Sequence, residues 1–179
     1  MNKKSTWKEI RFMLILSFIC GLLLGGTNLA IGNRGELTEK TITSVYSIIN
    51  IPIESNSIYE QFGKEFEELT KGRIKLWKNK NKPSIIACEA TGSGMWGDIT
   101  IVFVINKTNQ EFLGLKVTEQ KETAGLGSKI SEEDFEKKFS NKIIQSPVKV
   151  DAITGATTSS RSVEKILSKA LDKIKDIRP

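Results

Sequence analysis

The spacing of apolar residues changes along this chain, and each change marks a new kind of element. From residue 158 onward, apolar residues recur at intervals of three or four, which predicts one amphipathic helix. Its apolar positions are Val163, Ile166, Leu167, Ala170, Leu171, Ile174 and Ile177. In the middle of the chain, three runs rich in β-branched residues predict strands at residues 85–89, 99–105 and 112–119. The last two should pair, and residues 99–105 are apolar on nearly both faces, which indicates an interior strand.

Shorter patterns complete the predicted order. Residues 57–70 and 131–139 have helical spacing, residues 73–78 begin the strand-rich middle, and residues 148–153 predict a last strand before the closing helix. Helices, a strand meander, a helix, a strand and a helix in this order are typical of an α+β fold. The pattern therefore predicts a mostly antiparallel sheet with packed helices. It argues against the alternating order of a dinucleotide-binding sheet.

The N-terminal region carries a long uncharged segment. No charged residue occurs from residue 12 to residue 32. As a helix this segment would be roughly 30 Å long, which is enough to cross the apolar core of a bilayer. Residues 12–32 are therefore predicted to form a transmembrane helix, with residues 33–56 as a stalk and residues 57–179 as the folded domain.

The charges that flank this segment predict its orientation. Residues 1–11 carry Lys3, Lys4, Lys8 and Arg11 against one acidic residue, Glu9. By the positive-inside rule this basic tail stays in the cytoplasm. The domain at residues 57–179 is then expected outside the cytoplasm, at the cell membrane.

A cleaved signal peptide and a lipid anchor are the other interpretations of this segment. Asn28-Leu29-Ala30 is a poor cleavage site for a signal peptidase. A lipoprotein needs a small residue before its acylated cysteine, whereas Cys20 follows Phe18 and Ile19. The transmembrane helix is therefore the preferred interpretation.

The composition excludes several kinds of chemistry. The 179 residues include no histidine, so a nucleophile activated by histidine and an imidazole metal site are both excluded. Cys20 and Cys88 lie in different predicted regions, so we expect neither a disulfide between them nor an iron–sulfur site within one chain. A redox function would need a bound organic cofactor.

The charge distribution does not indicate nucleic-acid binding. The net charge is +6, but about half of it lies in the basic tail, and lysines alternate with glutamates elsewhere. The sequence contains neither a basic stripe with interleaved aromatic residues nor a nucleic-acid-binding motif. We therefore expect no nucleic-acid partner.

The segment before the closing helix, residues 151–157, reads Asp-Ala-Ile-Thr-Gly-Ala-Thr. Small residues at Gly155 and Ala156 let the backbone approach a bound group. Hydroxyl side chains then continue from residue 157 to residue 160 and supply capping oxygens. Unpaired amides and the positive end of the helix dipole would face an anion there. The segment therefore predicts a site that holds a phosphate on a threonine.

The same segment resembles a known family. Asp151, Thr154, Gly155, Ala156 and Thr157 match the pattern Asp-x-x-(Ser/Thr)-Gly-Ala-Thr of the bacterial FMN-binding domain family. In that family the last threonine carries FMN through a phosphoester bond. The resemblance implies covalent FMN on Thr157, with the neighbouring Thr158 as part of the same site.

Two more segments resemble this family and imply further cofactor contacts. The segment Glu122-Thr123-Ala124-Gly125-Leu126-Gly127 is similar to the family's Glu-Thr-Pro-Gly-Leu-Gly, with alanine in place of proline. Residues 92–97, Gly-Ser-Gly-Met-Trp-Gly, are similar to its glycine-rich segment. The resemblance implies that Trp96 and Leu126 flank the flavin ring and that amides at Gly125 and Gly127 approach its edge. Glu122 and Thr123 would orient the loop or contact the ribityl chain.

The resemblance also implies a function and partners. Among family members, the chain is most similar to the G subunit of the Rnf ion-translocating electron transport complex. This implies an electron carrier, not catalytic alone, in a ferredoxin:NAD⁺ oxidoreductase that moves Na⁺ or H⁺. The implied partners are other membrane subunits and a flavin transferase that uses FAD and magnesium.

Three alternatives to the Rnf interpretation stay open. The C subunit of the sodium-pumping NADH:quinone reductase shares the threonine pattern. A stand-alone flavinylated protein of extracellular electron transfer would use the same chemistry. A flavin-free anchored binding domain belongs to another functional class.

Overall fold

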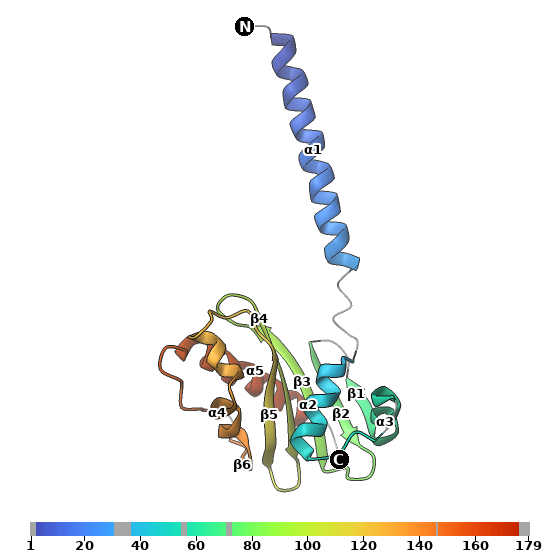
Figure 1. Ribbon diagram of the computed structural model, residues 1–179, viewed down its shortest axis with the longest axis vertical. Coiled ribbons are helices and arrows are strands. Elements are labelled where there is room, and N and C mark those ends of the chain that lie inside the picture. Colours follow the sequence, from blue (N-terminus) through green and yellow to red (C-terminus); the bar gives the residue numbers. More distant parts are fainter. Residues whose placement is uncertain (1–2, 31–36, 55–56, 71–72, 146, 176–179) are drawn as a thin grey trace. The chain divides into compact units, whose positions relative to one another are not determined.

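The computed structural model describes residues 3–30, 37–54, 57–70, 73–145 and 147–175. The chain divides into two compact units, residues 1–36 and residues 37–179. In its described part, the first unit is the single helix α1 (Lys3–Ala30) (Figure 1).

The described helices do not include a membrane span. In the ranges that the structure describes, no helix combines the length and the apolar character that crossing a bilayer requires. The structure therefore does not bear out the transmembrane helix predicted at residues 12–32. Residues 31 and 32 of that prediction lie outside the described residues.

The second unit is an α+β domain, as predicted, with one antiparallel sheet. The sheet has six strands in the order β1-β2-β3-β4-β5-β6, so each strand pairs with its neighbours in sequence. The strands are β1 (Phe66–Thr70), β2 (Ile74–Asn79), β3 (Ile85–Ser93), β4 (Asp98–Asn106), β5 (Glu111–Glu119) and β6 (Lys142–Ile143). The helices are α2 (Glu39–Ile49), α3 (Ile58–Glu65), η1 (Gly127–Ser131), α4 (Glu133–Glu136), η2 (Lys137–Phe139) and α5 (Thr157–Lys175).

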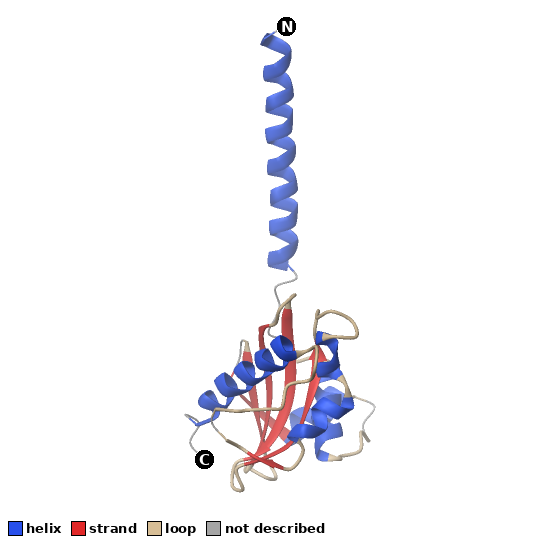
Figure 2. Ribbon diagram, turned by 90° about the vertical axis from the view of Figure 1, so that its left-hand side faces the viewer, coloured by secondary structure: helices blue, strands red, loops and turns tan. Residues whose placement is uncertain are grey.

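Helices cover both faces of the sheet, and this explains the apolar character of β4. Ile101 and Phe103 belong to the larger core, which also contains the apolar stripe of α5 from Val163 to Ile174. Val102 and Val104 belong to a second core with α2 and α3. The long helix α5 crosses one face of the sheet (Figure 2). The predictions of an interior strand at residues 99–105 and of its pairing with residues 112–119 are both confirmed.

The helix α2 belongs to this domain by its packing, although it lies in the segment predicted as a stalk. Ile42, Val45 and Tyr46 are buried against the sheet. The helix begins after Thr38, whose side chain accepts a hydrogen bond from the amide of Thr41. The polar cap therefore stabilises the start of the helix, and the apolar stripe packs residues 39–49 on the sheet.

Two predicted elements were wrong because tertiary contacts override local spacing. The helix predicted at residues 57–70 ends at Glu65, and the rest of that segment pairs with β2 as β1. Residues 148–153 form no strand in the described structure. The amides of Val148 and Val150 donate instead to side chains of α5, Ser168 Oγ at 3.3 Å and Glu164 Oε1 at 2.7 Å.

The burial of Tyr46 predicts a dependence of stability on alkaline pH. Burial, followed by the charge of Glu65, raises the pKa of the Tyr46 hydroxyl above its ordinary value of 10.0. The unfolded chain therefore ionises first, so stability that is complete below about pH 10 is lost as the pH rises further. In Tyr46→Phe, the fall of the melting temperature above pH 10 should be shallower than in the wild type.

A matched control for Tyr46→Phe is Tyr59→Phe, because the Tyr59 side chain is exposed. This control should keep the alkaline fall of the wild type. At pH 7, Tyr46→Phe should be at least as stable as the wild type, because the Tyr46 hydroxyl is buried without a hydrogen-bond partner in the described structure. Equal alkaline slopes in wild type and Tyr46→Phe would contradict the assignment to this hydroxyl.

Candidate functional site

The turn before α5 presents free backbone amides at a helix N-terminus. Gly155 has a φ of 83°, a left-handed conformation that favours glycine. The amide of Ala156 closes the turn on the carbonyl of Ile153 at 2.9 Å, and the amide of Ser160 donates to the carbonyl of Ala156 at 2.9 Å. The amides of residues 157–159 precede that bond, so they have no intrahelical acceptor. They are available to bind an anion.

The four hydroxyl side chains at this helix start fall into two pairs. Ser159 and Ser160 are buried. The Ser159 hydroxyl donates to Oε2 of Glu122 at 2.5 Å, and Ser160 Oγ accepts from the amide of Ile153 at 3.4 Å. Thr157 and Thr158 are exposed. Only these two of the four hydroxyls are open to modification.

The Gly-Leu-Gly loop, residues 123–128, lies against this turn. The carbonyl of Thr123 accepts from the amides of Leu126 at 3.2 Å and Ser128 at 3.1 Å, which closes the loop at the start of η1. Leu126 is 50% exposed. A Cβ added to Gly155 would lie 3.1 Å from Cδ2 of Leu126, so the leucine side chain contacts the backbone of the threonine turn.

The glycine-rich hairpin between β3 and β4 brings Trp96 to the same site. The amide of Gly94 donates to the carbonyl of Gly97 at 2.7 Å, so the hairpin is tight. Trp96 is 66% exposed at its tip. Oε1 of Glu122 accepts hydrogen bonds from the amides of Met95 at 2.9 Å and Trp96 at 3.1 Å. Through Glu122, the hairpin, the loop and the start of α5 form one connected site.

The structure thus brings together the three segments that sequence analysis singled out. Residues with exposed side chains or backbones are Trp96, Thr123, Gly125, Leu126, Asp151, Thr154, Gly155, Thr157 and Thr158, while Glu122, Gly127 and Ala156 are buried. The Asp151 carbonyl accepts from Lys138 Nζ at 2.8 Å.

The role of Ser159 was not predicted separately from that of the other three hydroxyl residues. A signal was nevertheless present, because the apolar stripe of α5, continued backward from Val163 at helical spacing, reaches Ser159 and Ser160. The same spacing leaves Thr157 and Thr158 outside the stripe.

The described part of the domain also contains a buried cysteine and a groove, both apart from this site. In the described part of the chain, no group of acidic or cysteine side chains is arranged to hold a metal ion. Cys88 is buried, and burial together with the charge of Glu89 raises the pKa of its thiol. A separate groove between α2 and β5 contains none of the predicted site residues. It is lined by Glu39, Lys40, Thr43, Ser44, Ser47, Lys116, Val117 and Thr118.

A match to a known family covers this site. The model of the FMN-binding domain matches residues 94–172, from the glycine-rich hairpin into α5. This part of the chain belongs to the FMN-binding domain family. The match includes the hairpin tip, the Gly-Leu-Gly loop and the threonine turn.

Two solved structures share the fold of the FMN-binding domain described here. The C subunit of the Na⁺-translocating NADH-quinone reductase from Parabacteroides distasonis has a TM-score of 0.55 and 16% identity, over 78% of this chain and 94% of that chain. NqrC from Shewanella oneidensis has a TM-score of 0.55 and 14% identity, over 73% and 92%. At these identities the likeness concerns the fold alone. Comparison with curated proteins finds no match.

The residues at the site fit an FMN molecule. An exposed threonine hydroxyl and free amides at the N-terminus of α5 suit its phosphate. Exposed apolar side chains at Trp96 and Leu126 suit a flat, partly apolar ring, which gains from stacking and burial. These two requirements are met on neighbouring segments of one domain.

Close packing at Gly127 predicts a large effect of one added methyl group. A Cβ at this position would lie 2.6 Å from Ser159 Oγ and 2.9 Å from Cβ of Glu122, so the loop would have to move away from α5. We expect Gly127→Ala to lower the free energy of unfolding by about 1–3 kcal/mol, measured by urea denaturation. The matched control is Gly63→Ala in α3, where an added Cβ meets no atom within 4 Å. Equal midpoints for Gly127→Ala and the wild type would contradict the packing argument.

Proposed function

We propose that this protein is an electron carrier that holds FMN covalently, through a phosphoester bond to Thr157. The family match supports FMN as the ligand. The observation that carries the proposal is the exposure of Thr157 beside free amides, while Ser159 and Ser160 are buried and hydrogen-bonded within the protein. The phosphate would receive hydrogen bonds from the first amides of α5 and would lie at the positive end of its dipole.

The remaining site residues would hold the flavin ring and its linker. Trp96 and Leu126 would pack on the ring, and the exposed backbone of Gly125 would offer its edge a close approach. Thr123 and Thr154 would contact the polar linker. FMN supplies the exchange of one or two electrons, and hydrogen bonds to one redox state of the ring shift its potential.

Attachment needs a donor of FMN. We propose an FAD-dependent flavin transferase that works with magnesium. The Thr157 hydroxyl oxygen attacks the FMN phosphorus of FAD, the pyrophosphate bond breaks, AMP leaves, and the hydroxyl proton is released. No electron is transferred in this step.

The proposed setting is an ion-translocating oxidoreductase at the cell membrane, with the flavin domain outside the cytoplasm. We propose the G subunit of an Rnf-type ferredoxin:NAD⁺ oxidoreductase that moves Na⁺ or H⁺, because the threonine pattern at residues 151–157 resembles that of this subunit. A second candidate is the C subunit of a sodium-pumping NADH:quinone reductase. Two structures of that kind of subunit share this fold, which supports the second candidate.

The test of flavin attachment is coexpression of the full chain with the transferase. We expect a fluorescent band on a denaturing gel and a mass increase equal to FMN less one water. A redox titration should then show reversible bleaching of the flavin absorbance. A soluble, folded chain of unmodified mass without flavin would favour the flavin-free binding domain instead.

Purification from the native host tests the setting. Copurification with Rnf-type membrane subunits would support the first candidate, and copurification with quinone reductase subunits the second. Recovery of flavinylated protein without membrane subunits would favour the stand-alone carrier. Protease accessibility of the flavin domain in intact cells or inverted vesicles tests its side of the membrane.

A further inference from the structure

Glu122 is buried at the centre of the site, and both of its carboxylate oxygens are bound by the protein itself. The residue is 8% exposed. Oε1 accepts from the amides of Met95 at 2.9 Å and Trp96 at 3.1 Å, and Oε2 accepts from the Ser159 hydroxyl at 2.5 Å. Three donors from two other segments therefore compensate one carboxylate.

Two glycines pack so closely around this carboxylate that they close it off. A Cβ at Gly94 would collide with Oε1 of Glu122. A Cβ at Gly127 would lie 3.0 Å from Oε2. The backbone of the hairpin and that of the Gly-Leu-Gly loop thus enclose the group. This geometry suits a carboxylate that organises protein segments, and it leaves little room for direct contact with a ligand.

We propose that Glu122 is a positioning residue that holds the Trp96 hairpin and the Gly-Leu-Gly loop on the N-terminus of α5. It acts through the backbone of Trp96 and the side chain of Ser159. The flavin-related part of this proposal rests on the proposed function, whereas the positioning itself concerns the protein alone. All three hydrogen bonds of Glu122 join protein groups, so the positioning acts on the backbone of the hairpin that carries Trp96 and on the start of α5.

The hydrogen bond between Glu122 and Ser159 also decides which hydroxyls stay exposed at the start of α5. An N-terminal serine hydroxyl would otherwise compete as a cap or as a phosphate ligand. By accepting a hydrogen bond from the Ser159 hydroxyl, Glu122 keeps this hydroxyl in the interior. The exposed side chains left at the helix start are then Thr157 and Thr158.

Three variants test the hydrogen bonds of Glu122 one set at a time. Glu122→Ala removes all three bonds and leaves two hairpin amides without their acceptor. Glu122→Gln keeps a carbonyl for these amides, but its NH₂ group must donate to Ser159. Ser159→Ala removes only the link to α5. Glu136→Ala is the matched control, because Glu136 is also a buried carboxylate and accepts from an amide, that of Val117 at 2.9 Å.

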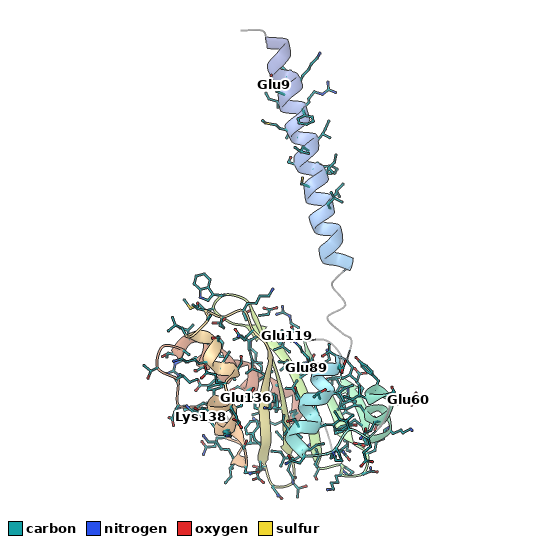
Figure 3. The ribbon with its side chains drawn as sticks, viewed as in Figure 1. Glu9, Glu60, Glu89, Glu119, Glu136 and Lys138 are labelled. Atoms are coloured by element: carbon teal, nitrogen blue, oxygen red, sulfur yellow. The ribbon has the colours of Figure 1, made fainter. Side chains whose placement is uncertain are left out.

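Hydrogen exchange on the flavin-free chain tests positioning without any cofactor. We expect the Met95 and Trp96 amides to exchange about tenfold faster or more in Glu122→Ala, and within about threefold of wild type in Glu122→Gln. Glu136→Ala should change exchange at Val117 and leave the hairpin amides unchanged. Glu136 is the last residue of α4, and Figure 3 shows it apart from Glu119 at the end of β5.

Unchanged exchange of Met95 and Trp96 in a folded Glu122→Ala variant would overturn the proposal. If Glu122→Ala does not fold, Ser159→Ala decides. Faster exchange in residues 157–160 of that variant, with an unchanged melting temperature, supports the link to α5, and wild-type exchange there overturns it.

The flavinylated chain provides the readout specific to the cofactor. In Glu122→Ala, looser packing should lower the fluorescence anisotropy of the bound flavin and reduce its visible circular dichroism, and Glu122→Gln should restore most of both signals. Flavin signals unchanged in Glu122→Ala would overturn the role toward the ring. A wild-type chain that takes up no flavin would instead contradict the proposed function, and the exchange result would stand independently.

Discussion

Thr157→Ala should abolish covalent flavin completely while leaving the domain folded. Thr157 is exposed at the first residue of α5, and Thr158 is the other exposed hydroxyl at the helix start. Loss of the hydroxyl removes the oxygen that forms the phosphoester bond, so no fluorescent band and no mass increase should appear after coexpression with the transferase. The free energy of unfolding should change by less than about 1 kcal/mol, because the side chain is at the surface.

Thr158→Ala is the control that makes this result specific. It removes the neighbouring exposed hydroxyl from the same helix turn, and it should retain the full mass increase. Mass spectrometry of the peptide that covers residues 150–161 locates the modification directly. Covalent FMN that persists in Thr157→Ala and disappears in Thr158→Ala would move the attachment point by one residue.

Lys75→Met should destabilise the domain strongly, by about 3–5 kcal/mol. Lys75 and Glu89 form an ion pair at 2.5 Å and are 4% and 7% exposed, and the Thr41 hydroxyl also donates to Glu89. Lys75 of β2 and Glu89 of β3 are opposite each other in the sheet, and Figure 3 labels Glu89 next to α2. Removing the ammonium leaves a buried carboxylate with its charge uncompensated, and urea denaturation at pH 7 measures the loss.

Two further variants show whether the loss comes from the unpaired charge. The double variant Lys75→Met/Glu89→Met removes both charges and should be clearly more stable than Lys75→Met alone. Lys137→Met breaks an exposed pair with Glu133 at 3.0 Å and should leave the urea midpoint close to that of the wild type. A Lys75→Met midpoint equal to that of the wild type would contradict the assignment of the loss to an uncompensated charge on Glu89.

The elements predicted correctly from the sequence are those whose periodic pattern is long and whose contacts agree with it. The apolar stripe of α5 repeats over several turns, and its members from Val163 to Ile174 are buried on the sheet. Ile177, also predicted as part of the stripe, lies outside the described residues. β4 is apolar on both faces because helices cover both sides of it. In these places local spacing and tertiary burial favour the same conformation, so the pattern alone was sufficient.

The wrong predictions fall where a segment satisfies its backbone through distant partners. Phe66 lies at helical spacing from Phe62, yet it belongs to β1 and pairs there with Asn79 of β2. Its ring also stacks on that of Phe62, with 4.6 Å between the ring centroids. Val150 has the composition of a strand residue, yet its amide bonds to Glu164 of α5. Spacing along the chain contains no information on which remote acceptor a backbone amide will find.

The candidate site also depends in part on local sequence pattern and in part on tertiary packing. The order of residues established that a glycine-bearing turn and a run of hydroxyls precede a helix, because these residues act through local backbone conformation and capping. The choice among the four hydroxyls depended on the fold, since Glu122, 37 positions before Ser159, withdraws that residue from the surface. Burial and long-range hydrogen bonding left Thr157 and Thr158 exposed, and such effects arise only when the hairpin, the loop and the helix are packed together.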